Sequence, residues 1–114
     1  MPKLNRFHIK IETGEVGTKQ PVYFTINNHK VPFEEVKGDV GPGQTFESGF
    51  EVSSFAHSMT LVGPEQGKWD IQKIRVDYDC EGTQPYSVTF GQVELDEATE
   101  VNIWNDPPLP TWDV

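Results

Sequence analysis

The sequence predicts an all-β protein, folded as a two-sheet antiparallel β-sandwich of about eight strands. Two observations lead to this class. Apolar and polar side chains alternate in most segments, which is the pattern of a strand with one buried face. Ten Gly and nine Pro divide the 114 residues into short stretches, with turn signals at intervals of about 8–14 residues. A β-barrel or a jelly roll is the alternative, because alternation alone does not tell how the sheets close.

The alternation is clear from the first strand onwards. Phe7, Ile9 and Ile11 fall on one face of their segment, while the intervening residues are polar or charged. The second strand ends at Asn27-Asn28, because Asn tolerates the left-handed backbone of a tight turn. The expected strands, in chain order, are residues 6–13, 22–28, 30–36, 44–52, 56–62, 69–78, 86–95 and 100–104.

Four positions interrupt the alternation and predict local irregularities. Pro32 makes its segment an edge strand, because proline has no N–H to donate to a neighbouring strand. Gly49 is a candidate β-bulge. The apolar residues before and after Gln72-Lys73 are out of phase, which predicts a bulge or kink there. The phase changes again at Gly91, which is a further bulge candidate.

The length allows one domain, which we assign to residues 1–104. Residues 105–114 form a Pro-rich tail, for which three prolines favour an extended conformation. The formal net charge of −9 repels the phosphate backbone, so nucleic acid is not an expected partner. No apolar stretch approaches the roughly 18 residues of a transmembrane segment.

The single cysteine, Cys80, cannot form an internal disulfide, and we expect it to be a small buried residue. The first residues lack the apolar centre of a secretory signal. Both observations favour a cytoplasmic location.

Catalytic motifs are missing from the sequence. The three histidines are scattered, and there is no Gly-x-Ser-x-Gly, no His-x-x-x-His and no phosphate-binding glycine loop. His8 falls on the polar face of its strand and is expected to be an ordinary exposed histidine. We therefore expect a binding protein rather than an enzyme.

One acidic run indicates a calcium site. In Asp77-Tyr-Asp-Cys-Glu-Gly82, the carboxylates of Asp77, Asp79 and Glu81 alternate as in the first part of an EF-hand loop. Position twelve of that loop should be Glu and is Val88 here, so the segment is not an EF-hand. Calcium as a cofactor remains open, and the alternative is a solvated strand end.

The tryptophans suggest a second kind of site. Exposed Trp or Tyr can stack on sugar rings or enter a membrane interface, which makes Trp69, Trp104 and Trp112 candidate ligand-binding residues. The alternative for Trp69 and Trp104 is a place in the core or at its rim. Trp112 lies in the tail, which could cover an exposed edge or dock on a partner.

Two parts of the chain carry a family resemblance. Residues 11–18, Ile-Glu-Thr-Gly-Glu-Val-Gly-Thr, precede the strand of residues 22–26. Residues 69–79 precede a turn with Gly82 and the segment 90–95, Phe-Gly-Gln-Val-Glu-Leu. These segments resemble the PLAT family, the β-sandwich domain of lipoxygenases, polycystins and some bacterial lipases and toxins. The resemblance covers less than half of the chain.

The sequence also departs from that family's pattern. Lys19-Gln-Pro21 replaces the usual small polar residues, Tyr86 lies near the place of the family's tryptophan, and residues 31–43 have no counterpart. The resemblance implies an eight-stranded sandwich whose loops contact lipid, membrane or a protein partner, sometimes through calcium. The loop positions that it implies are Thr13, Gly14, Gly17, Thr18, Asp77 and Asp79.

The leading expectation is a non-enzymatic binding module that contacts a lipid surface or a protein partner through its edge loops, with calcium as an optional aid. One alternative is a carbohydrate-binding module that uses exposed Trp and Tyr. The other is a structural or assembly protein that docks through its C-terminal tail.

Overall fold

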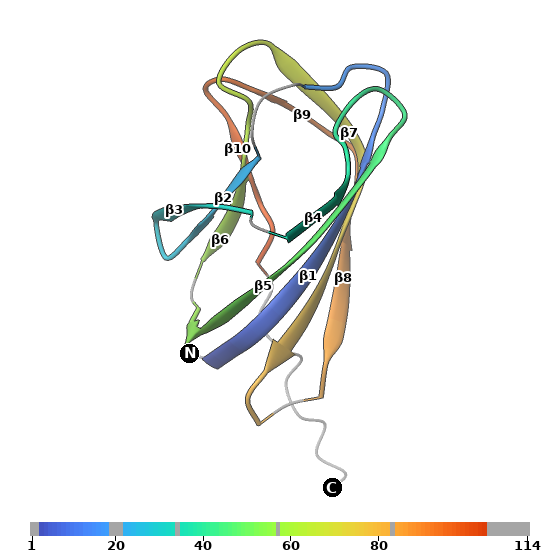
Figure 1. Ribbon diagram of the computed structural model, residues 1–114. Helices are drawn as coiled ribbons and strands as arrows, with labels where there is room; N and C mark the ends of the chain where they lie inside the picture. The colour runs from blue at the N-terminus through green and yellow to red at the C-terminus, as the bar shows by residue number, and fades with distance from the viewer. Residues whose placement is uncertain (1–2, 19–21, 34, 57, 83, 105–114) are drawn as a thin grey trace, which may run out of the picture.

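The computed structural model describes residues 3–18, 22–33, 35–56, 58–82 and 84–104, and folds them into two antiparallel sheets (Figure 1). The large sheet has six strands in the order β4-β5-β1-β7-β8, and β9 also pairs with β7; the small sheet has the order β10-β6-β2-β3. The strands are β1 Lys3–Thr13, β2 Tyr23–Ile26, β3 His29–Pro32, β4 Glu35–Gly38, β5 Thr45–Phe55, β6 Met59–Val62, β7 Lys68–Cys80, β8 Tyr86–Phe90, β9 Val93–Asp96 and β10 Glu100–Asn102.

The predicted all-β sandwich is confirmed, with ten described strands in place of about eight. The sheets do not close into a barrel within the described residues. The same residues include no helix that is long and apolar enough to cross a membrane. The tail, residues 105–114, lies outside the described part of the chain.

The core between the sheets is rich in aromatic rings. Phe7 of β1 meets Phe24 of β2 edge to face, with ring centroids 5.1 Å apart. Phe33, Phe46 and Phe50 extend this cluster. Buried rings contribute large apolar areas and favour edge-to-face geometry, so the cluster holds the two sheets together.

A tight turn joins β2 to β3 where the sequence predicted it. Asn27 and Asn28 have positive φ angles of 50° and 70°, and Ile26 pairs directly with His29 across the two-residue turn. This is the left-handed backbone that Asn tolerates better than most residues.

The expected single edge strand over residues 30–36 is wrong. The chain forms β3 in the small sheet and β4 in the large sheet, and it changes sheet at Phe33. Phe33 is buried in the aromatic cluster, so burying this one ring separates the two short strands. Pro32 is the last residue of β3, an edge strand as its missing N–H requires.

The irregularity predicted at Gln72-Lys73 is confirmed. Glu12 pairs with Lys73 and Thr13 with Ile71, so β7 contains one extra residue relative to β1. Gly91 is not a bulge within a strand, because it lies in the break between β8 and β9. The two interruptions are opposite each other, since β8 pairs with β7 after Lys73 and β9 pairs with it before Gln72.

The bulge predicted at Gly49 is wrong. Gly49 pairs with His8 in an uninterrupted stretch of the pairing between β1 and β5. The register of these two strands shifts between Leu4 and Arg6, near the start of β1 and the end of β5. Ser53, with a positive φ of 50°, lies in that irregular part. Gly49 therefore needs another explanation, which the outer face of the sheet provides.

Candidate functional site

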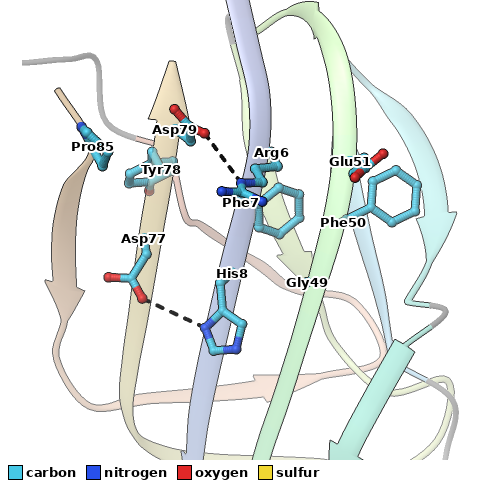
Figure 2. A pocket seen from close by; sticks show the side chains of 10 residues that line it. All are labelled: Arg6, Phe7, His8, Gly49, Phe50, Glu51, Asp77, Tyr78, Asp79 and Pro85. Atoms are coloured by element: carbon cyan, nitrogen blue, oxygen red, sulfur yellow. Dashed lines mark ion pairs between the residues drawn. The ribbon is translucent and has the colours of Figure 1, made fainter. Parts of the chain in front are cut away.

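A groove of about 640 Å³ lies on the large sheet, and we call it the sheet groove (Figure 2). It spans β5, β1 and β7 and reaches the turn before β8. Its polar side chains point away from the core, opposite to buried neighbours such as Phe7 and Tyr78. The lining residues are Arg6, Phe7, His8, Gly49, Phe50, Glu51, Asp77, Tyr78, Asp79 and Pro85.

Strand register explains why these residues meet. Arg6 lies between Glu51 of β5 and Asp79 of β7. Residues that oppose each other on neighbouring antiparallel strands have β-carbons about 5 Å apart. A row of side chains with alternating charge therefore crosses the sheet.

The adjacent row of outward-facing residues, which contains His8, explains why position 49 is a glycine. His8 lies between Gly49 on one side and Asp77 on the other. Because glycine has no side chain, the surface beside the imidazole stays open, and this opening contributes to the groove. The residue expected to make a bulge therefore leaves open surface beside His8.

Two ion pairs cross from β1 to β7 in the groove (Figure 2). Arg6 Nε lies 3.3 Å from Asp79 Oδ2, and His8 Nδ1 lies 3.7 Å from Asp77 Oδ2. The Arg6 side chain is 69% exposed. Its contact uses only Nε, whereas a guanidinium has two further NH₂ groups that can donate.

Asp77 has the densest set of polar contacts on this face. Arg75 Nε donates to Asp77 Oδ1 at 3.2 Å, and the Ser87 hydroxyl donates to the same oxygen. Partial burial by itself would raise the pKa of Asp77. The hydrogen bonds from Ser87 and Arg75, together with the charges of Arg75 and His8, outweigh that effect and hold the pKa of Asp77 below its usual value.

The order of these groups is not that of a hydrolase. In a catalytic triad the histidine lies between the nucleophile and the acid, where it accepts the nucleophile's proton. Here Asp77 lies between Ser87 and His8, so the imidazole does not contact the hydroxyl. These contacts orient the carboxylate of Asp77.

The three expected calcium ligands, Asp77, Asp79 and Glu81, each contact different neighbours. Asp77 and Asp79 face the same side of β7, but each already has a cationic neighbour. Glu81 lies in the following turn, where its backbone N–H donates to the carbonyl of Lys3 at 2.8 Å. Across the described parts of the chain, no three His, Cys, Asp or Glu side chains form a group that could hold a metal ion. Calcium binding stays a prediction.

Thr13, an expected ligand-binding residue, has a structural contact instead. It is 3% exposed, and its hydroxyl accepts a hydrogen bond from Nε1 of Trp69 at 3.0 Å. Trp69 itself is 1% exposed. Neither face of this buried ring is accessible from solvent, which supports the alternative of a place in the core, and a ligand role for Trp69 stays a prediction.

Trp104 also lacks an exposed ring face. Trp104 is 7% exposed and packs edge to face on Tyr78, with centroids 5.3 Å apart. This position supports the alternative of a place in the core for Trp104 as well, and its ligand role stays a prediction. Trp112 lies outside the described residues.

The expected loop of Gly14, Gly17 and Thr18 packs against residues 39–44. The N–H of Gly43 donates to the carbonyl of Gly14 at 2.9 Å, and that of Thr18 to the carbonyl of Val40 at 2.9 Å. A β-carbon at Gly17 would overlap the Val40 carbonyl, so close backbone contact explains this glycine.

The two loops border a second hollow of about 470 Å³ at the end of the sandwich. Thr13 and Gly14 are in its lining, but Gly17 and Thr18 are not. Sequence reasoning thus located one loop of this hollow and missed the other, residues 39–44, for which no motif was available.

Sequence reasoning also missed Arg6, Gly49 and Glu51 as site residues. The available signal was the polar face of the alternating strands, on which His8 was placed as an exposed histidine. Which polar residues meet across the sheet depends on register, and alternation within one strand does not contain that information.

Comparison of the chain with family models, curated proteins and solved structures finds no match. The resemblance to the PLAT family therefore stays a prediction from the residues.

Proposed function

We propose that this protein is a non-enzymatic binding module that holds a basic, extended segment of a protein partner in the sheet groove. The main support for this proposal is the charge of the lining residues. The carboxylates of Glu51, Asp77 and Asp79 outnumber the guanidinium of Arg6. Arg75 neutralises Asp77 from outside the lining, and Arg6 pairs with Asp79, so the carboxylate of Glu51 gives the groove its net negative charge.

Long-range charge favours the same partner. The net charge of −9 attracts cationic segments and accelerates their encounter. Arg6 gives the acidic groove a fixed donor as well, to which a backbone carbonyl of the bound segment could bind.

The dimensions of the groove suit a short extended peptide. It crosses three neighbouring strands, a width of about 10 Å at about 4.8 Å per strand spacing. Extended chain advances by about 3.4 Å per residue, so roughly three residues fit across the groove.

The exposed apolar residues support a lipid surface less well than a basic peptide as the partner. Val16, Val36 and Phe55 are the large hydrophobic side chains exposed in the described part of the chain. Val16 lies in the loop after β1, Val36 on the edge strand β4 and Phe55 at the end of β5. Because these positions are separated, they do not form one membrane-inserting patch.

A carbohydrate is supported less for a different reason. Sugar rings are bound by exposed aromatic faces, whereas Phe7 and Tyr78 beneath the groove are buried. The groove presents charged groups to solvent, and charged groups fit a basic peptide better than a neutral sugar.

The test is an NMR titration of the ¹⁵N-labelled protein with a lysine hexapeptide. We expect amide shifts at Arg6, His8, Gly49 and Glu51, which weaken as salt rises because exposed charges are screened. Glu51→Lys should reduce the affinity about tenfold, since it places a like charge in the groove.

The matched control is Glu97→Lys, which makes the same charge change in the exposed turn between β9 and β10. Equal loss in both variants would mean attraction to net charge alone and would reject the groove. A hexapeptide of glutamate and vesicles of phosphatidylserine are the other arms. Shifts of the groove residues with vesicles only would assign the face to lipid instead.

A further inference from the structure

The edges of the two sheets differ in how well they are protected. Four edge strands carry charge or proline: β3 contains Lys30 and Pro32, β4 contains Lys37, β9 contains Glu94 and Asp96, and β10 contains Glu100 and has three residues. Charges, proline and shortness are the usual features that prevent edge strands from pairing with other chains.

β8 has none of these features. It is five residues long, Tyr-Ser-Val-Thr-Phe, and contains no charge, no proline and no glycine. In the described part of the chain its inner neighbour is β7, and no strand pairs with its outer edge. Among the edge strands in the described part of the chain, β8 is the one without a charged side chain, and Tyr86, Val88, Thr89 and Phe90 favour strands.

The residues of β8 are also symmetric about Val88. Aromatic residues occupy both ends, hydroxyl residues come next, and Val88 is at the centre. Antiparallel pairing of two copies about Val88 would place Tyr86 opposite Phe90 and Ser87 opposite Thr89. A two-fold interface requires a surface that is complementary to itself, and this order of residues satisfies that requirement.

The two faces of such a pair match as well. Tyr86, Val88 and Phe90 pack toward the core and are half-buried, so pairing would cover their remaining apolar surface. Ser87 and Thr89 are exposed on the opposite face, where hydroxyl groups on adjacent strands can hydrogen-bond.

Charges on the neighbouring strand are complementary in the same register. Asp77 pairs with Ser87 and Arg75 with Thr89. In the two-fold arrangement, Ser87 of one copy would lie opposite Thr89 of the other. The row of neighbouring residues would then run from Asp77 of the first copy to Arg75 of the second. Each of the two symmetry-related rows would therefore have an acidic residue of one β7 and a basic residue of the other on its two sides.

We propose that two copies of this chain associate through β8, paired antiparallel about a two-fold axis at Val88, so that the two large sheets become one continuous sheet. Only five residues of each copy pair, so the dimer is weak and depends on concentration. The proposal does not rest on the sheet groove or on its ligand.

Sedimentation equilibrium from about 10 µM to about 1 mM tests this dimer, a range that spans weak dissociation constants. The mass should rise from monomer toward dimer. Val88→Lys should raise the dissociation constant at least about tenfold, because it places two ammonium groups on the symmetry axis. The matched control is Val36→Lys on β4, at a valine that is 46% exposed on the opposite edge of the same sheet.

A monomer mass across the whole range would overturn the proposal, as would loss of the dimer in Val36→Lys alone. Hydrogen exchange of the unmodified protein decides the case in which Val88→Lys does not fold. Amides within Ser87–Phe90 should exchange more slowly at high protein concentration. Unchanged exchange in a protein that does dimerise would place the interface elsewhere.

Discussion

The two faces of β1 show opposite chemistry on one strand. Phe7, Ile9 and Ile11 point inward and are almost completely buried. Arg6 and His8 point outward, with side chains 69% and 48% exposed. Adjacent residues therefore differ in what they do: one set holds the sheets together, and the other is available to a partner.

The energies of the two faces differ accordingly. Burying a large apolar side chain contributes about 1.5–3 kcal/mol, whereas an exposed ion pair contributes about 0–1 kcal/mol. The outer face can thus change its charges at little cost in stability. This difference explains why a binding surface can be built on strands that also form the core.

The largest expected effect is that of Phe7→Ala. Phe7 contacts Phe24, Phe33 and Phe50, and its loss should lower the free energy of unfolding by about 3–5 kcal/mol. His8→Ala, one residue further on the outer face, should cost less than about 1 kcal/mol. Urea unfolding of both variants measures the contrast, and similar losses would contradict the division between the faces.

A smaller effect is expected from Asp77→Asn, and it depends on pH. The folded state holds the pKa of Asp77 below its ordinary value of 3.8, so the ionised group stabilises the fold. This contribution is complete above the pKa of the unfolded chain and disappears as pH falls through the lower pKa of the folded state. The variant should be less stable than the original at pH 6, by about 1 kcal/mol or less.

The difference between the two proteins should shrink as pH falls below about 4. Urea unfolding at several pH values measures it, and Glu97→Gln in an exposed turn is the matched loss of one carboxylate. A difference that stays constant from neutral to acidic pH would show that the charge of Asp77 is not what stabilises the fold.

The smallest expected effect is that of calcium. Because Arg6 and Arg75 already neutralise Asp79 and Asp77, millimolar calcium should leave the melting temperature unchanged. A site at 100 times its dissociation constant would add about 2.7 kcal/mol. A rise in melting temperature that is absent in Asp79→Asn would contradict this expectation and support the predicted calcium site on the outer face.

Several features of the fold were predictable because their causes are local. Alternation of apolar and polar residues follows from the geometry of a single strand. The Asn27-Asn28 turn and the extra residue at Gln72-Lys73 depend on residues that are adjacent in the chain. The wrong expectation at Gly49 shows the limit, since glycine alone does not distinguish a bulge from an open space beside a neighbouring strand.

The sequence by itself determined the all-β class, most of the strands and the faces that they bury. Only the tertiary structure decided which strands are neighbours, where the chain changes sheet at Phe33, and that Arg6 lies between Glu51 and Asp79. The physical reason is that strand pairing joins residues far apart in the chain. Their register is selected by the packing of the whole core and not by any one segment.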